Sequence, residues 1–87
     1  MKTSVFLRVP LQEKILFTKN MALALRSGIS LVNSLKLMQN QAKSKSMKKI
    51  LMSLMDDANR GVFLSAALDR FKNGFGDLFI NVIRVAE

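Results

Sequence analysis

Two adjacent carboxylates, Asp56 and Asp57, are the first candidates for catalysis or metal binding in this sequence. Neighbouring residues on a helix point about 100° apart, so these two side chains cannot easily converge on one reacting atom or ion. Ser27, Ser30 and Ser34 also lie near one another, but the chain contains no His, and no clearly placed base stands ready to activate them. We expect a solvated polar face at the aspartates, capping and packing at the serines, and no enzyme.

The composition removes further kinds of chemistry. Neither Cys nor His occurs among the 87 residues, which excludes disulfides, Cys or His zinc sites and His-based catalytic triads. The four glycines form no phosphate-binding loop and no dinucleotide fingerprint. We expect no cofactor and no metal, and we leave open whether the carboxylate of Glu87 takes part in a cation site.

Lysines gather in one short segment of this basic chain, whose formal net charge is +8. Lys43, Lys45, Lys48 and Lys49 fall within seven residues. Such a segment suits three roles: a solvated turn, a contact for lipid headgroups or an acidic protein, or a loop that contacts DNA phosphates. The residues alone do not choose among them.

The stretch around Gly28 gives the DNA interpretation most of its support. A helix that stops at Gly28 and a second helix capped by Ser30 form a tight joint, as in helix-turn-helix modules. Asn33, Lys36 and Gln39 could then touch base edges. The long apolar helix before the joint, the lack of Arg on the second helix and the spread of cations along the chain argue against it. A small basic helix-turn-helix-like DNA-binding domain is therefore the alternative function.

Every element that positions these residues is predicted to be a helix. Residues 10–27 are apolar nearly all round, which predicts a central helix or one whose outer face meets a partner. Apolar residues at helical spacing predict a second helix after Gly28, a third that ends near Gly61, a short fourth that stops near Gly74, and a fifth from Asp77 onward. The apolar stripe expected on the fifth helix comprises Leu78, Phe79, Val82, Ile83 and Ala86.

The predicted fold class is all-α, a compact antiparallel bundle of five visible helices with a sixth lost by truncation. The bundle domain spans residues 10–87, and residues 1–9 form an N-terminal extension. Met21, Met38 and Met47 fall in core stripes, where a flexible thioether fills gaps, whereas Met52 and Met55 lie off the main stripe.

Taken in order, these residues resemble the cytoplasmic domain of the type II secretion system F-protein family. The resemblance covers residues 9–87, and Gly76 and Ala86 depart from the Pro and Gly that the family commonly shows there. The residues that carry the resemblance are Phe17, Gly28, Leu31, Leu35, Gly61, Leu64, Ser65, Ala67, Leu68 and Glu87.

The resemblance implies a non-enzymatic scaffold for assembly of a type IV pilus or a type II secretion pseudopilus. It implies placement on the cytoplasmic side of the bacterial inner membrane, in a full-length protein that is membrane-embedded. The implied partners are an assembly ATPase, other inner-membrane assembly proteins, and the pilin or pseudopilin whose extrusion the ATPase drives, with no nucleic acid. The all-round apolar first helix adds a homodimer to these expectations.

Overall fold

The computed structural model describes residues 8–87, and regular structure in this range is entirely helical. Residues 1–7 of the predicted N-terminal extension (residues 1–9) lie outside the described range. A 3₁₀ turn, Asp69–Phe71, joins α4 to α5 without a gap, so residues 8–87 form five helical segments. This confirms the all-α prediction. The helices are α1 (Leu11–Ser27), α2 (Leu31–Gln41), α3 (Lys45–Asn59), α4 (Leu64–Leu68), α5 (Lys72–Phe75) and α6 (Asp77–Ala86).

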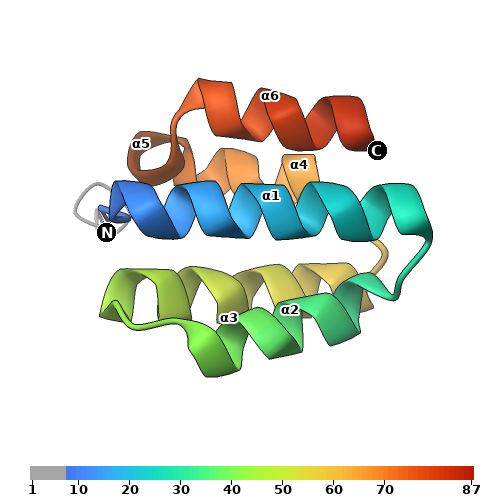
Figure 1. Cartoon of the computed structure of the whole chain (residues 1–87), viewed down its shortest axis with the longest axis horizontal. Coiled ribbons are helices and arrows are strands. Elements are labelled where there is room, and N and C mark those ends of the chain that lie inside the picture. Colours follow the sequence, from blue (N-terminus) through green and yellow to red (C-terminus); the bar gives the residue numbers. More distant parts are fainter. Residues whose placement is uncertain (1–7) are drawn as a thin grey trace.

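Helix α1 lies at the centre of the bundle (Figure 1). Helices α2 and α3 lie on one side of it and α4, α5 and α6 on the other, with consecutive segments antiparallel. Helix α1 packs mainly on α2 and α6, and α3 packs on α2 and α4. Helices α1 and α6 lie side by side and run in the same direction, although they belong to opposite halves of the chain. The all-round apolar character of residues 10–27 predicted a central helix or one whose outer face meets a partner, and the structure shows the central position.

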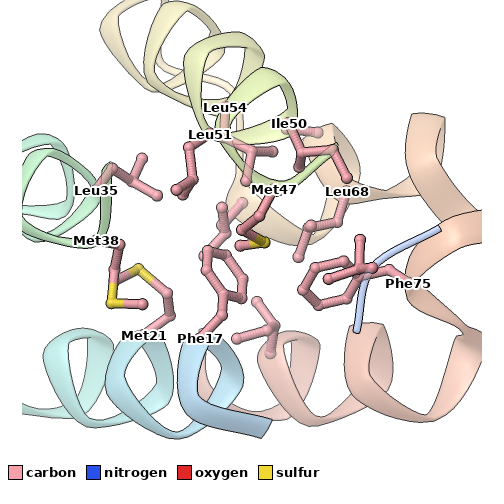
Figure 2. Close-up of a cluster of buried hydrophobic side chains, with 14 of the residues drawn as sticks. Phe17, Met21, Leu35, Met38, Met47, Ile50, Leu51, Leu54, Leu68 and Phe75 are labelled. Atoms are coloured by element: carbon pink, nitrogen blue, oxygen red, sulfur yellow. The ribbon is translucent and has the colours of Figure 1, made fainter. Parts of the chain in front are cut away.

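The core receives side chains from all five segments, as Figure 2 shows for much of it. The ring of Phe17 meets that of Phe75 edge-on at 5.1 Å between centroids, and Phe75 meets Phe79 in the same way at 6.4 Å. Such pairs add about 0.5–1.5 kcal/mol beyond the burial of the rings. The largest fully buried side chains are Phe17, Met21, Leu35, Met47, Ile50, Leu51, Leu54, Leu64, Leu68, Phe75, Ile80 and Ile83.

The joint between α1 and α2 has the predicted geometry. Gly28 ends α1 in the left-handed conformation at φ 74°, and its backbone N–H donates to the carbonyl of Ala24. The hydroxyl of Ser30 accepts from the backbone N–H of Asn33 at 3.3 Å and so caps α2.

The fourth helical segment ends at Phe75, next to Gly74, where its end was predicted. Gly74 lies inside α5, and the C-cap residue is Gly76, whose φ of 92° is open to glycine but rarely to other residues. Phe75 is completely buried, so its packing against Phe17 holds the helical turn that includes Gly74.

Candidate interaction surface

The predicted lysine cluster lies at the turn between α2 and α3, which we call the lysine end of the bundle. Lys43 is in the turn, whereas Lys45, Lys48 and Lys49 belong to the first five residues of α3, and all four side chains are exposed. None of them forms an ion pair with another residue in the range 8–87. A helix N-terminus carries partial positive charge, and the first turn of α3 has no acidic residue, so this position is unfavourable for cations.

Glu13 of α1 supplies the negative charge that α3 lacks at its start. Its carboxylate accepts hydrogen bonds from the backbone N–H of Lys43 at 2.9 Å, from the backbone N–H of Ser44 at 3.4 Å, and from the Ser44 hydroxyl. The Ser44 hydroxyl oxygen in turn accepts from the backbone N–H of Met47 at 3.1 Å. Glu13 and Ser44 therefore cap α3 together, across 31 residues of chain.

This environment lowers the pKa of Glu13 from its ordinary value of 4.5. Burial of the carboxyl group raises the pKa, but the hydrogen bonds from the Ser44 hydroxyl and from the backbone of Lys43 and Ser44, with the charge of Lys43, outweigh burial. Glu13 is therefore ionised at neutral pH, where its charge offsets the dipole of α3.

Most residues that carry the family resemblance serve packing and turns. Leu31 is partly buried against the core, and Gly28 and Gly61 adopt left-handed conformations at φ 74° and 83°. Ser65 is buried and pairs with Glu87. The others are fully buried side chains: Phe17, Leu35, Leu64, Ala67 and Leu68.

The Ser65–Glu87 pair closes the opposite end of the bundle, which we call the cleft end. The backbone N–H of Ser65 donates to Oε2 of Glu87 at 2.8 Å, and its hydroxyl donates to Oε1 at 2.7 Å. Phe63, the N-cap residue of α4, has no side-chain acceptor, so Glu87 provides the capping carboxylate from the end of α6. Both oxygens of Glu87 are thus engaged by protein donors. Within residues 8–87, no three side chains of the His, Cys, Asp and Glu types gather closely enough to hold a metal ion.

A cleft with a volume of about 850 Å³ opens at this end. Leu25 at the end of α1, Leu31 at the start of α2, and Arg84 of α6 contribute to its lining. Phe63 also lines it, and 72% of that side chain is exposed.

The expected solvated face at Asp56 and Asp57 is right for Asp56 and wrong for Asp57. Asp57 is only 1% exposed, and Arg70 binds its carboxylate, with Nη1 3.1 Å from Oδ2 and Nη2 3.2 Å from Oδ1. Asp57 follows buried Leu54 by three residues on α3 and so shares its face. That spacing was readable in the sequence, and it identifies Asp57 as a structural residue that joins α3 to the turn after α4.

The side chains proposed to touch DNA bases are not equally available. Asn33 and Lys36 are exposed on α2, whereas Gln39 is only partly exposed. Ser34, one of the serines for which capping or packing was expected, is buried.

The net charge is confined to one part of the chain, a feature that counting lysines and arginines alone does not reveal. Residues 56–87 contain four basic and five acidic residues and are nearly neutral. Between residues 14 and 55 there is no Asp or Glu at all. The basic residues of that acid-free segment are Lys14, Lys19, Arg26, Lys36, Lys43, Lys45, Lys48 and Lys49.

Comparison with known protein families gives a match across most of the described bundle. The family described as "Type II secretion system (T2SS), protein F" matches residues 17–87. The chain belongs to this family. The match begins at Phe17, inside α1, and runs through every later helix of the protein F domain.

One curated relative of this protein F domain is the type IV pilus assembly protein PilC of Thermus thermophilus. The two are 27% identical over 77 residues, which is 88% of this chain and 19% of the relative. The chain thus spans about a fifth of the length of that relative. No solved structure matches this chain. Among the helices of residues 8–87, none combines the length and apolar character that crossing a bilayer requires.

Proposed function

We propose that this protein F domain lies on the cytoplasmic side of a bacterial inner membrane and scaffolds assembly of a type IV pilus or a type II secretion pseudopilus. In this role it couples a cytoplasmic ATPase to extrusion of pilin or pseudopilin. The family match over residues 17–87 carries the proposal, and the relative named for type IV pilus assembly supports it. The same match favours a scaffold over an enzyme and over a helix-turn-helix DNA-binding module.

The architecture supports a domain that moves as one body. Side chains from all five helical segments meet in a single core, and a carboxylate caps a distant helix at each end. Exposed Lys43, Lys45, Lys48 and Lys49 then offer a cationic contact to the ATPase, to another assembly protein or to lipid headgroups.

The decisive experiment uses the full-length protein in its own bacterial host. Lys43, Lys45, Lys48 and Lys49 are replaced together by Gln, with the fourfold Arg variant as the charge-conserving control. We expect the Gln variant to weaken binding of the purified assembly ATPase about tenfold and to reduce pilus or pseudopilus formation, while the Arg variant keeps both. If deletion of the whole protein leaves pilus assembly and secretion unchanged, the proposed function is wrong.

Placement on the cytoplasmic side can be tested by cysteine labelling, because this chain has no Cys of its own. Lys49 is exposed, so Lys49→Cys in an otherwise cysteine-free full-length protein provides one reactive thiol. A membrane-impermeant maleimide should label it only after the inner membrane is permeabilised. Labelling in intact spheroplasts would place the domain on the other side.

We also propose that the domain forms homodimers through α6. Leu78, Val82 and Val85 recur at spacings of four and three on this helix, and they are 71%, 38% and 82% exposed. Sedimentation over a wide concentration range should show a monomer–dimer equilibrium that Leu78→Asp and Val85→Asp shift to monomer. A wild-type chain that stays monomeric throughout would contradict this part of the proposal.

A further inference from the structure

A groove between α1 and α2 is bordered by large apolar side chains that the bundle does not cover. Leu23 of α1, Ile29 of the joint and Leu37 of α2 line it, and they are 59%, 56% and 63% exposed. Buried Met21 and Met38 also line it, and Figure 2 shows these two thioethers side by side. Flexible methionines let such a surface adapt to the side chains that enter it.

The groove continues along α1 beyond this cavity. A smaller depression next to it shares Met38 and Gln41 and is lined by Leu16, which is 46% exposed. Leu16 and Leu23 are seven residues apart, or about 10 Å along the helix axis. The uncovered apolar surface is therefore an elongated strip that runs parallel to two helices.

The charged residues beside the groove itself are basic, because it lies within the acid-free segment 14–55. Glu13 lines the far end of the smaller depression, where Lys43 and Ser44 already bind its carboxylate. Lys19 lies four residues before Leu23 and Arg26 three residues after it, so all three share one side of α1. Together they line another depression, which Val82 of α6 also lines. Lys36 directly precedes Leu37 on α2. All three cations are exposed, and none has an ion-pair partner among the described residues.

We propose that this groove binds an amphipathic α-helix of a partner protein, with an apolar face that inserts between Leu23 and Leu37 and with acidic flanks. Helix-in-groove recognition uses apolar anchors at i, i+3 or i+4, and i+7, which matches the length of the strip. The acidic flanks pair with Lys19, Arg26 and Lys36. The proposal rests on the groove and its charge, so it stands whether or not the domain couples an ATPase.

Other occupants fit the groove less well. Its volume of about 210 Å³ accepts one or two side chains but is smaller than the ~300–1,000 Å³ of small-molecule pockets. A bilayer surface would contact the rims without filling a channel between two helices. A second copy lacks a suitable helix, because α6 has Asp77 as its only carboxylate, and exposed Asp56 and Asp69 already pair with Arg60 and Arg84.

The proposal can be tested without knowing the partner. A surface-displayed library of helical peptides of about 18 residues is selected for binding to the wild-type chain. We expect the enriched peptides to carry Asp and Glu beside apolar residues spaced at i, i+3 or i+4, and i+7. Their amide-shift changes in the ¹⁵N-labelled protein should fall on α1 and α2, and their binding should weaken with salt.

Matched variants separate this groove from other exposed apolar surface. The Leu23→Asp/Leu37→Asp variant should lose at least about tenfold in affinity, whereas Met52→Asp on α3, where the side chain is 62% exposed and lines no described cleft, should bind as the wild type does. If Leu23→Asp/Leu37→Asp does not fold, the surface-only variant Lys19→Gln/Arg26→Gln/Lys36→Gln provides the test and should also lose about tenfold.

Several outcomes would overturn the proposal. The proposal is wrong if the selection yields no binder or if the enriched peptides lack acidic flanks. It is also wrong if the groove variants bind the peptides as tightly as the wild type does. Phosphatidylglycerol vesicles that bind through Leu23 and Leu37 more tightly than any peptide would identify a lipid surface instead. A wild-type dimer that these two substitutions dissociate would identify a second copy.

Discussion

Each end of the bundle uses a glutamate and a serine to cap a helix, but the two pairs are built differently. At the lysine end, Glu13 reaches from the start of α1 and accepts three hydrogen bonds from Lys43 and Ser44. At the cleft end, Glu87 follows α6 and accepts two, both from Ser65. Ser44 is itself the N-cap of α3, whereas the N-cap of α4 is Phe63, which has no acceptor to offer.

The difference teaches what each carboxylate compensates for. Glu13 neutralises positive charge, because exposed lysines and the partly positive N-terminus of α3 both lie near its carboxylate. Glu87 replaces a missing cap, because the side chain of Phe63, the N-cap residue of α4, cannot accept a hydrogen bond from the first N–H groups of that helix. One pair is therefore mainly electrostatic and the other mainly a hydrogen-bonding device that fastens the last helix.

The largest expected effect comes from removing the carboxylate at the lysine end. Glu13→Ala leaves three donors without their acceptor and the lysines without a counter-charge, and should lower the free energy of unfolding by about 2 kcal/mol. Glu87→Ala should cost about 1 kcal/mol, since it removes two bonds. Urea unfolding measures both, with exposed Gln12→Ala as the neutral control. If the two substitutions lower the free energy of unfolding equally, the proposed difference between the electrostatic cap at the lysine end and the hydrogen-bonding cap at the cleft end is wrong.

A second substitution asks whether the cleft end also depends on backbone conformation. At Gly28 an added Cβ would meet no atom within 4 Å, so Gly28→Ala tests only the left-handed φ of 74°. It should cost about 1 kcal/mol in thermal or urea unfolding. Gly28→Asn should recover part of that loss, because Asn tolerates this conformation. An alanine variant as stable as the wild type would show that the turn does not depend on glycine.

The pH dependence of stability should carry the signature of Glu13. Because its pKa is lowered on folding, Glu13 stabilises the fold above its ordinary value of 4.5, and this contribution disappears as the pH falls through the lowered pKa. The difference in unfolding free energy between wild type and Glu13→Gln should be constant near neutral pH and shrink in acid. Ser44→Ala should narrow this pH window, since it removes a bond that lowers the pKa. A difference that does not change with pH would contradict the assignment.

The smallest effect should come from the lysines themselves. Lys45→Gln/Lys48→Gln/Lys49→Gln relieves repulsion at the positive end of α3 and should raise stability by a few tenths of a kcal/mol at low salt. The gain should vanish at about 1 M salt, where charges are screened within about 3 Å. A decrease in the free energy of unfolding would mean that these side chains stabilise the fold, and it would contradict their assignment as a free contact surface.

The sequence predicted those features that depend on neighbours along the chain. Helix boundaries, the left-handed Gly28, the Ser30 cap and the burial of Met21 and Met38 all follow from periodicity or turn chemistry. The pairs Glu13–Ser44 and Ser65–Glu87 could not be predicted in this way. They join residues 31 and 22 positions apart, and only the packing of whole helices brings them together.

The buried face of α6 shows the limit of periodicity most clearly. Leu78 and Val82 belong to the apolar stripe predicted for this helix but are 71% and 38% exposed, while Ile80, outside that stripe, is 1% exposed. Asp77, Asn81 and Arg84 form one polar side of α6, but the apolar side is wider than the part that the bundle buries, so the sequence does not show which apolar residues are covered. Packing against α1 and the position of Phe79 determine which face is buried. The Phe79 ring packs edge-on against Phe75, and the ammonium nitrogen of Lys14 lies 5.7 Å from the centroid of the Phe79 ring.

The parallel course of α1 and α6 has a mechanical consequence. The start of α1 and the end of α6 lie at opposite ends of the bundle (Figure 1), whose longest dimension is 34 Å. A pull between these two points runs along both helix axes, so the contacts between them are loaded together instead of being peeled apart turn by turn. Stretched in this direction, the domain should behave as a stiff strut that yields only when α6 slides past α1 as a unit.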